Sequence, residues 1–283
     1  MSERQCTLAR PAEIKGVGLF FGQPVQLRCL PAPAGSGIVF VRTDLPGQPQ
    51  IPAAIANVPP GPQRWTALRK GEAEVRMIEH LLAALFGLGI DNLVIETTAM
   101  EMPVGDGSAK TFTEPFLAAG VRELDAPRRC GQLKRPVIVT ESDIVLAAAP
   151  STGGLRVTYI LDYGQHFVRC QSLTLDVTRE LFLDGIAGAR TYVLRPEVDA
   201  FIKLGLGRGA TPENTIVLEE DGRLSGSERF PDECVRHKIL DMLGDLFLSG
   251  RLISARVIGY KSGHATNIRL AKAIAEACDA DDQ

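Results

Sequence analysis

One pattern of helix, turn and strand occurs once in each half of the chain and restricts the folds that the chain can adopt. Residues 79–96, EHLLAALFGLGIDNLVIE, run from a histidine-bearing helix through a glycine turn into an apolar strand. Residues 236–259, RHKILDMLGDLFLSGRLISARVIG, repeat that order. Because helices and sheets must each bury an apolar face, the repeat predicts two related α+β domains, each placing its histidine-bearing helix where the other can meet it.

Both halves are predicted to mix short strands with helices. Residues 10–76 contain β-type segments separated by Pro- and Gly-rich turns, and a helix is expected at about 75–87. The polar stretch LDAPRRCGQ is a candidate linker, which predicts an N-terminal domain at 1–126 and a C-terminal domain at 127–283. Further helices are expected between GDGSA and Gly120, near 177–187, over 232–248 and after YKSGHATN.

One segment of the second half has no counterpart in the first. Residues 191–218 have the pattern of a strand, a helix and a second strand, with Gly205 as the expected end of the helix. This segment is therefore predicted to be an insertion in the C-terminal domain.

Composition excludes several classes of protein. The formal charge is 31 − 34 = −3, so no basic field favours nucleic acid as a partner. No apolar run has the length of a membrane span, and the first residues lack the apolar core of a signal peptide. The six cysteines are scattered without a C-x-x-C pair, as in a protein with free thiols. We therefore expect a soluble cytoplasmic protein.

The predicted helix at 232–248 carries three polar residues at a spacing of four. His237, Asp241 and Asp245 share one side of this helix, while leucines and isoleucines form a separate core face. Two carboxylates one turn apart repel each other unless a cation lies nearby, and a histidine and an aspartate at this spacing can both reach a metal ion. A solvated polar stripe is the alternative interpretation of the same pattern.

A third metal ligand is available in the first half. His80 points away from the apolar side of its helix, and the small residues Ala83 and Ala84 beside it allow another element to come close. Two histidines and one carboxylate, with a fourth position open, are the ligand set of a catalytic zinc. Glu79 could then deprotonate a water molecule. A histidine that is only satisfied within the core or at the surface remains the alternative for His80.

His264 lies in YKSGHATN, a glycine-containing turn before the last predicted helix. Either it is a surface histidine near a helix start, or it is a protonated histidine that Asp245 keeps charged. In the second case it could stabilise an oxyanion and protonate a leaving amine.

Several motifs occur together in a fixed order: IEHLLAAL, GLGIDN, DGSA, ARTY, LGLGRG, NTIVL, VRHKILDMLGDLFLSG and YKSGHATN. Together they resemble the UDP-3-O-acyl-N-acetylglucosamine deacetylase family, the zinc enzymes that commit bacteria to lipid A synthesis, over almost the whole chain. The resemblance implies two α+β domains, each a small, mostly antiparallel sheet layered with two helices, with the active site between the helix layers.

The resemblance also implies roles for individual residues. The zinc ligands would be His80, His237 and Asp241, and Glu79 would be the general base. His264, oriented by Asp245, would be the electrophile or acid, and Thr191 would polarise the scissile carbonyl. The substrate-binding positions would be Lys238 and Lys261 at the phosphates, Tyr163 at the uracil, and Tyr192 of ARTY. A strand-edge threonine and a solvated helix lysine are the alternatives for Thr191 and Lys238, and Asp106 of GDGSA is interpreted as a turn residue.

These observations predict a zinc-dependent amidohydrolase, acting as a monomer, that removes the N-acetyl group of UDP-3-O-(3-hydroxyacyl)-N-acetylglucosamine. The resemblance also implies that the 191–218 segment forms an apolar passage for the acyl chain. A divergent enzyme acting on another N-acylated amino sugar is the alternative, since Phe20, Met77 and the Gly209–Thr211 segment depart from the family pattern.

Overall fold

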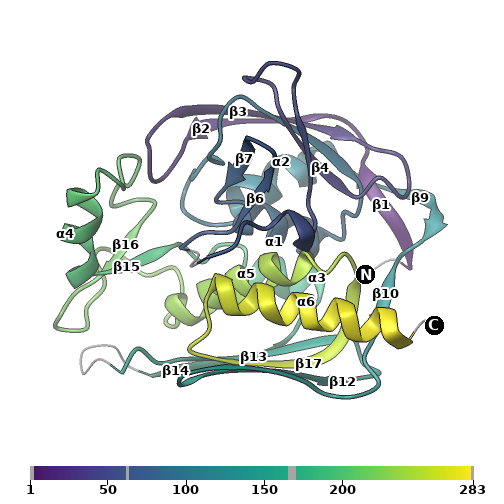
Figure 1. The fold of residues 1–283 in the computed structure, drawn as a ribbon. Coiled ribbons are helices and arrows are strands. Elements are labelled where there is room, and N and C mark those ends of the chain that lie inside the picture. Colours follow the sequence, from purple (N-terminus) through teal and green to yellow (C-terminus); the bar gives the residue numbers. More distant parts are fainter. Residues whose placement is uncertain (1–2, 62–63, 165–169, 282–283) are drawn as a thin grey trace.

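The chain is arranged in four layers, with a sheet on each outside and helices between them (Figure 1). This computed structural model describes residues 3–61, 64–164 and 170–281. The arrangement confirms the predicted α+β class with helix layers facing each other. Among the described residues, no helix is long and apolar enough to cross a membrane.

The first outer layer is a five-stranded sheet that is antiparallel except where β4 and β8 run parallel. Residues alternate between buried and exposed along β3, so Val25, Leu27 and Cys29 face the core. In order across the sheet the strands are β2 (Ala12–Val17), β3 (Pro24–Pro31), β8 (Leu93–Thr97), β4 (Ile38–Arg42) and β5 (Gln50–Pro52).

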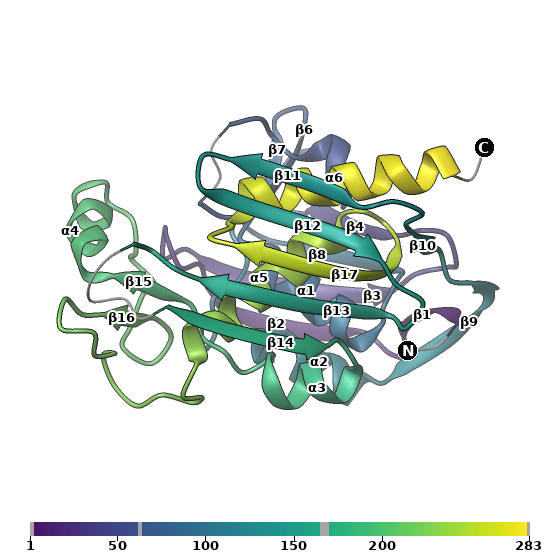
Figure 2. The same ribbon diagram turned by 90° about the horizontal axis from the view of Figure 1, so that it is seen from below.

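The second outer layer is a sheet seen from its outer side in Figure 2, and its central strand, β17, is the apolar segment predicted to follow the second histidine-bearing helix. β17 runs parallel to β13 and β10 and antiparallel to β12. The main path is β11 (Val137–Glu141), β12 (Ile144–Pro150), β17 (Leu252–Tyr260), β13 (Leu155–Leu161) and β14 (Gln171–Asp176), with β10 (Cys130–Gln132) also paired to β17.

Two helices lie on the inner face of each sheet. In the first half these are α1 (Glu79–Leu88) and α2 (Lys110–Ala119), and in the second half they are α5 (Glu233–Phe247) and α6 (His264–Asp281). A short helix, α3 (Arg179–Gly185), packs on α1. All ten residues of α1 are buried, because the helix is enclosed by its own sheet and by α5.

Helices α1 and α5 come unusually close at Gly244. A Cβ atom at this position would lie 2.1 Å from the backbone oxygen of Glu79, so only glycine permits the observed approach. The small residues expected to permit close packing beside His80 are therefore matched by a glycine on the opposite helix. This contact places the beginning of α1 directly against the polar side of α5.

Helix α1 begins at Glu79, later than the expected start at about 75. Residues up to Arg76 belong to β7 (Ala73–Arg76), which forms a hairpin with β6 (Ala67–Lys70). Met77 then adopts a φ of 58°, in the left-handed region, and this turn separates the strand from the helix.

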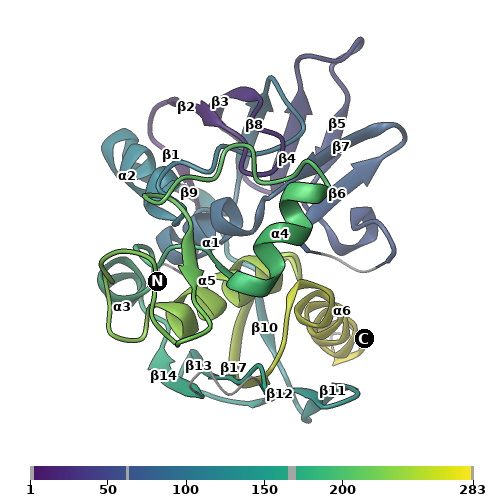
Figure 3. The same cartoon turned by 90° about the vertical axis from the view of Figure 1, so that its left-hand side faces the viewer.

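The segment at 191–218 stands to one side of the four layers in Figure 1 and faces the viewer in Figure 3. It contains β15 (Tyr192–Leu194), α4 (Arg195–Lys203) and β16 (Ile216–Leu218), and the two strands pair in parallel. Gly205, with a φ of 69°, follows the end of α4. We call residues 191–218 the insert.

The remaining strands pair the start of the chain with the middle. β1 (Arg4–Leu8) pairs antiparallel with β9 (Val121–Pro127), and the expected domain boundary at 126/127 falls at the end of β9. A single 3-10 turn, η1, occupies Ile55–Asn57.

Candidate metal centre and active site

Three ligand atoms converge where α1 faces α5. The Nε2 atom of His80 lies 3.6 Å from Oδ1 of Asp241, and Nε2 of His237 lies 3.4 Å from the same oxygen. One ligand atom from each of the three residues lies within 4.8 Å of the others, and all three residues are buried. Two imidazoles and a carboxylate at this separation fit a divalent metal ion of the zinc type.

The hydrogen bonding of His237 prepares it as a ligand. Its Nδ1 atom lies 3.1 Å from the carbonyl oxygen of Ala189, and a carbonyl can only accept, so Nδ1 carries the proton. The lone pair therefore belongs to Nε2, which faces His80 and Asp241. Burial lowers the pKa of His237 to about 4, which keeps the ring neutral as metal binding requires.

Lys238 fixes the orientation of the Asp241 carboxylate. Its Nζ atom donates to Oδ2 of Asp241 at 2.8 Å, which leaves Oδ1 facing the two histidines. The lysine predicted to be either solvated or substrate-binding is thus also a partner of a candidate metal ligand.

Glu79 lies beside the metal site without belonging to the ligand set. Its Oε2 atom accepts a hydrogen bond of 3.0 Å from the backbone N–H of Thr66, and its Oε1 atom lies 3.7 Å from Nε2 of His264. Burial raises the pKa of the Glu79 carboxyl above its usual range. A carboxylate of raised pKa is a stronger base, and the position suits proton transfer.

His264 is held by the second aspartate of the α5 stripe. Its Nδ1 atom lies 3.0 Å from Oδ2 of Asp245, which is fully buried. Burial alone would lower the pKa of His264, but the charges of Asp245 and Glu79 outweigh it and raise the pKa to about 9. The imidazole is therefore protonated at neutral pH and can act as an acid.

Two residues of this network were not predicted from the sequence. The hydroxyl of Thr66 donates to Oδ1 of Asp245, and the amide of Asn267 donates to Oδ2 at 2.9 Å. Asn267 follows His264 by three residues on α6, so helical spacing in the YKSGHATN motif could have identified it. Thr66 is 179 residues from Asp245, and no local pattern marks it.

These groups open onto one cavity of about 420 Å³. Glu79, His264 and the three candidate ligands line one part of it. Thr191 also lines the cavity, and its backbone N–H is bound to the Gly107 carbonyl at 2.8 Å. The remaining wall is mainly apolar and includes Leu19, Phe20, Val193, Val198, Phe201, Ile202 and Leu206.

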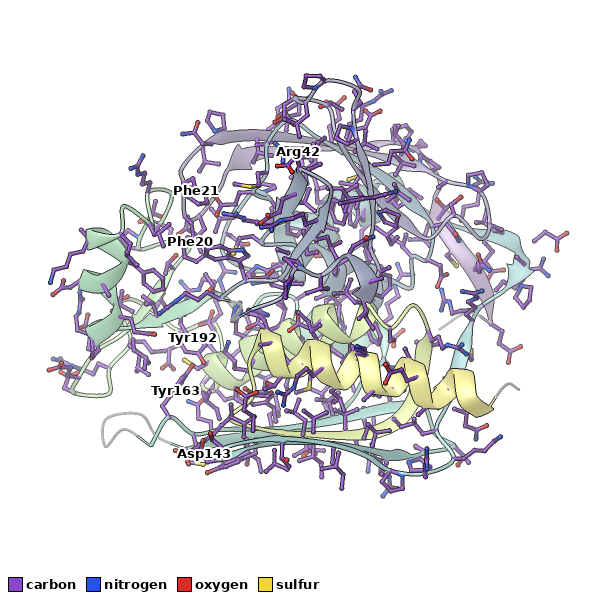
Figure 4. The ribbon with its side chains drawn as sticks, viewed as in Figure 1. Phe20, Phe21, Arg42, Asp143, Tyr163 and Tyr192 are labelled. Atoms are coloured by element: carbon purple, nitrogen blue, oxygen red, sulfur yellow. The ribbon has the colours of Figure 1, made fainter. Side chains whose placement is uncertain are left out.

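The two tyrosines predicted at the substrate site lie together at the cavity (Figure 4). The hydroxyls of Tyr163 and Tyr192 share a hydrogen bond of 2.7 Å. The ring of Tyr192 lies 6.0 Å from the ring of His237, and the ammonium of Lys238 lies 5.6 Å from the Tyr192 centroid. Tyr192 and Lys238 therefore adjoin candidate metal ligands, and Tyr163 contacts Tyr192.

Lys261 is placed differently from the other predicted substrate residues. It does not line the cavity, and its ammonium is paired with Asp143 at 2.7 Å and with Asp162 at 3.6 Å. Asp106 is a turn residue as predicted, since it accepts hydrogen bonds from the backbone and side chain of Ser108 and pairs with Arg229. His166, the fourth histidine, lies outside the described residues.

Comparison with known proteins decides the family. Residues 5–276 match the family described as UDP-3-O-acyl N-acetylglycosamine deacetylase. The chain belongs to this family. The UDP-3-O-acyl-N-acetylglucosamine deacetylase of Myxococcus xanthus (strain DK1622) is 40% identical over 274 residues, which cover 96% of this chain and 87% of that protein. The enzyme of the same name from Chlamydia felis (strain Fe/C-56) is 40% identical over 279 residues, covering 98% and 99% of the two chains.

The resemblance expected from the motifs is thereby confirmed. This deacetylase family is a family of metalloenzymes, and His80, His237 and Asp241 form the corresponding candidate metal site in this chain.

Proposed function

We propose that this chain hydrolyses the N-acetyl group of UDP-3-O-(3-hydroxyacyl)-N-acetylglucosamine, releasing acetate and a free amine in the committed step of lipid A biosynthesis. The observation that carries the proposal is the convergence of a His-His-Asp set, a buried glutamate and a protonated histidine on one cavity. Family membership and the names of the two relatives support it.

The proposed metal is zinc, held by His80, His237 and Asp241. When bound there, zinc would supply a Lewis acid that polarises the amide carbonyl and acidifies a water molecule. The neutral, pre-oriented imidazole of His237 and the carboxylate held by Lys238 are the features of this chain that favour the assignment.

The proton transfers are assigned to two residues. Glu79 accepts a proton from the attacking water, whose oxygen forms the new bond to the acetyl carbon. The charge that develops on the carbonyl oxygen is stabilised by the imidazolium of His264 and by the hydroxyl of Thr191. As the C–N bond breaks, Glu79 or His264 gives a proton to the departing amine, and Asp245 keeps the imidazole oriented.

The substrate is proposed to lie across the cavity. Lys238 supplies a cation for the diphosphate, Tyr163 and Tyr192 supply aromatic surface for the nucleotide, and the insert supplies the apolar wall for the acyl chain. Lys261 is also proposed to meet a phosphate, which requires it to exchange its contacts with Asp143 and Asp162.

The proposal also covers the oligomeric state, the cellular compartment and the division into domains. We propose a monomer as the active unit, because a single chain supplies the three candidate ligands, the base and the acid. No two of the six cysteines, all of which lie within the described residues, form a disulfide, which supports the cytoplasm as the compartment. We also propose the division into domains at 1–126 and 127–283.

The direct test is to incubate zinc-loaded protein with UDP-3-O-acyl-N-acetylglucosamine and with UDP-N-acetylglucosamine, and to measure the free amine. The acylated substrate is expected to react with a kcat/KM higher by orders of magnitude, because burying each methylene contributes about 0.8 kcal/mol. Equal efficiency on both substrates would contradict the proposal and favour an amidohydrolase for another amino sugar.

A further inference from the structure

An aromatic cluster forms the cavity wall where the insert meets the first half of the chain. The ring of Phe20 lies 4.8 Å from the ring of Trp65 and 5.8 Å from the ring of Phe201, measured between centroids. Phe20 and Phe201 line the cavity, whereas Trp65 does not. Trp65 therefore supports the ring of Phe20 from outside the cavity.

The backbone of Phe20 is fixed on both sides. The carboxylate of Glu101, which is 3% exposed, accepts the backbone N–H of Phe20 at 2.6 Å and that of Phe21 at 3.1 Å. The carbonyl of Phe20 accepts the N–H of Arg208, which belongs to the insert, at 3.1 Å. Since both peptide groups are held, the position of the Phe20 ring is set in advance of any ligand.

The insert lies directly on the loop that carries Phe20. The N–H of Gly209 donates to the carbonyl of Leu19 at 2.9 Å, and a Cβ at Gly209 would lie 2.1 Å from the oxygen of Gly18. Glycine at position 209 thus allows the two backbones to come into contact.

The ring of Phe201 is contacted by a charged pair that also lines the cavity. The guanidinium of Arg64 lies 4.9 Å from the Phe201 centroid, within cation–π range, and 3.8 Å from the carboxylate of Glu197. The apolar wall is therefore anchored both to the first half of the chain and to α4.

Phe21 provides a natural contrast to Phe20. It shares the Glu101 carboxylate but does not line the cavity, and its ring lies 5.8 Å from the guanidinium of Arg76. Figure 4 shows both phenylalanines on the side of the molecule that carries the insert. Two adjacent residues of the same type thus differ in whether they meet the cavity.

We propose that Phe20 is a specificity-determining residue that recognises the acyl chain of the substrate. Its ring, supported by Trp65 and Phe201, is a rigid apolar face against which the methylenes of the chain pack. This inference rests on the proposed deacetylase function. Each methylene buried against such a face raises kcat/KM by roughly fourfold, a gain that a sugar without the chain cannot obtain.

The test compares the ratio of kcat/KM on UDP-3-O-acyl-N-acetylglucosamine to that on UDP-N-acetylglucosamine in four proteins: wild type, Phe20→Ala, Phe20→Leu and Phe21→Ala. Phe20→Ala should lower this ratio by about tenfold or more, corresponding to the lost burial of two methylenes. Phe20→Leu keeps an apolar side chain and should lower the ratio less, by about threefold. Phe21→Ala should leave the ratio as in the wild type.

Three other outcomes would overturn the role of Phe20, and a fourth would overturn the deacetylase function. If Phe20→Ala lowers activity on both substrates equally, the residue only maintains the structure and the inference is wrong. A Phe21→Ala ratio reduced as much as that of Phe20→Ala would have the same meaning. If Phe20→Ala does not fold, an unchanged ratio in Phe20→Leu overturns the inference. Wild-type protein that releases amine from no acylated substrate would instead refute the deacetylase function itself.

Discussion

At the scale of single residues, Thr66 connects the candidate base to the candidate acid. Its backbone N–H binds Glu79, and its hydroxyl binds Asp245 and lies 3.2 Å from Nδ1 of His264. The groups proposed to accept and to donate protons are therefore both positioned by one buried residue, which no sequence pattern identifies.

Thr66→Val keeps the backbone N–H and the side-chain shape but removes the hydroxyl. The charged carboxylate of Asp245 then loses the hydrogen bond that it accepts from the hydroxyl, and kcat should fall by about 10- to 100-fold with little change in KM. Thr66→Ser, which restores the hydroxyl, should recover most of the rate. Equal kcat values for Thr66→Val and Thr66→Ser in steady-state kinetics would contradict this account.

In the proposed mechanism, the pKa of His264 sets an upper limit on the active pH range. Its pKa is raised to about 9, so the protonated form persists at neutral pH and is lost as the pH rises through that value. The kcat/KM of the wild type should therefore fall above about pH 9, because the proton donor disappears. In His264→Gln this basic limb should be absent and the remaining rate lower by about 10²–10⁴-fold. A limb that persists in the variant would assign it to another group.

At the scale of elements, the separation of α1 and α5 determines whether the ligands meet. Gly244→Ala would place a Cβ 2.1 Å from the backbone oxygen of Glu79 and force the helices apart. The expected cost is about 1–3 kcal/mol in the free energy of unfolding, together with weaker metal binding. Denaturant unfolding and metal titration measure both effects. Gly153→Ala, where a Cβ meets no atom within 4 Å, should change neither.

Helical spacing allowed α5 and its polar stripe to be predicted from the sequence. Contacts between distant segments could not be predicted in this way. The four-residue stripe of His237, Asp241 and Asp245 is a local pattern, and the structure keeps it on one side of a helix. The start of α1 was misplaced because the left-handed conformation of Met77 has no signature in a non-glycine residue. The contacts of Lys261 with Asp143 and Asp162 join separate loops, so residue spacing along the chain could not predict them.

At the scale of the whole molecule, the candidate metal site joins the two halves of the chain. One candidate ligand, His80, comes from the first half, and the other two come from α5 of the second, so metal binding there would be coupled to the packing of the halves. A metal that binds only the folded chain stabilises it, by about 2.7 kcal/mol when the free metal is at 100 times its dissociation constant.

Removal of the metal by chelation should therefore lower the Tm measured by calorimetry, and added zinc should restore it. His237→Ala should have a Tm that responds to neither treatment, because two remaining ligands hold zinc poorly. A wild-type Tm indifferent to the chelator would contradict a metal bound between the halves.

In the proposed mechanism, Glu79 acts on the water and is not a ligand of the metal. Glu79→Gln retains an oxygen that can accept the Thr66 N–H but removes the basic carboxylate. The decisive measurement is the zinc content and kcat of this variant, determined on the same preparation. We expect about one zinc per chain, as in the wild type, and a kcat lower by about 10²–10⁴-fold. Loss of the metal would make Glu79 a ligand, and an unchanged kcat would place the base elsewhere; either result would contradict the proposed mechanism.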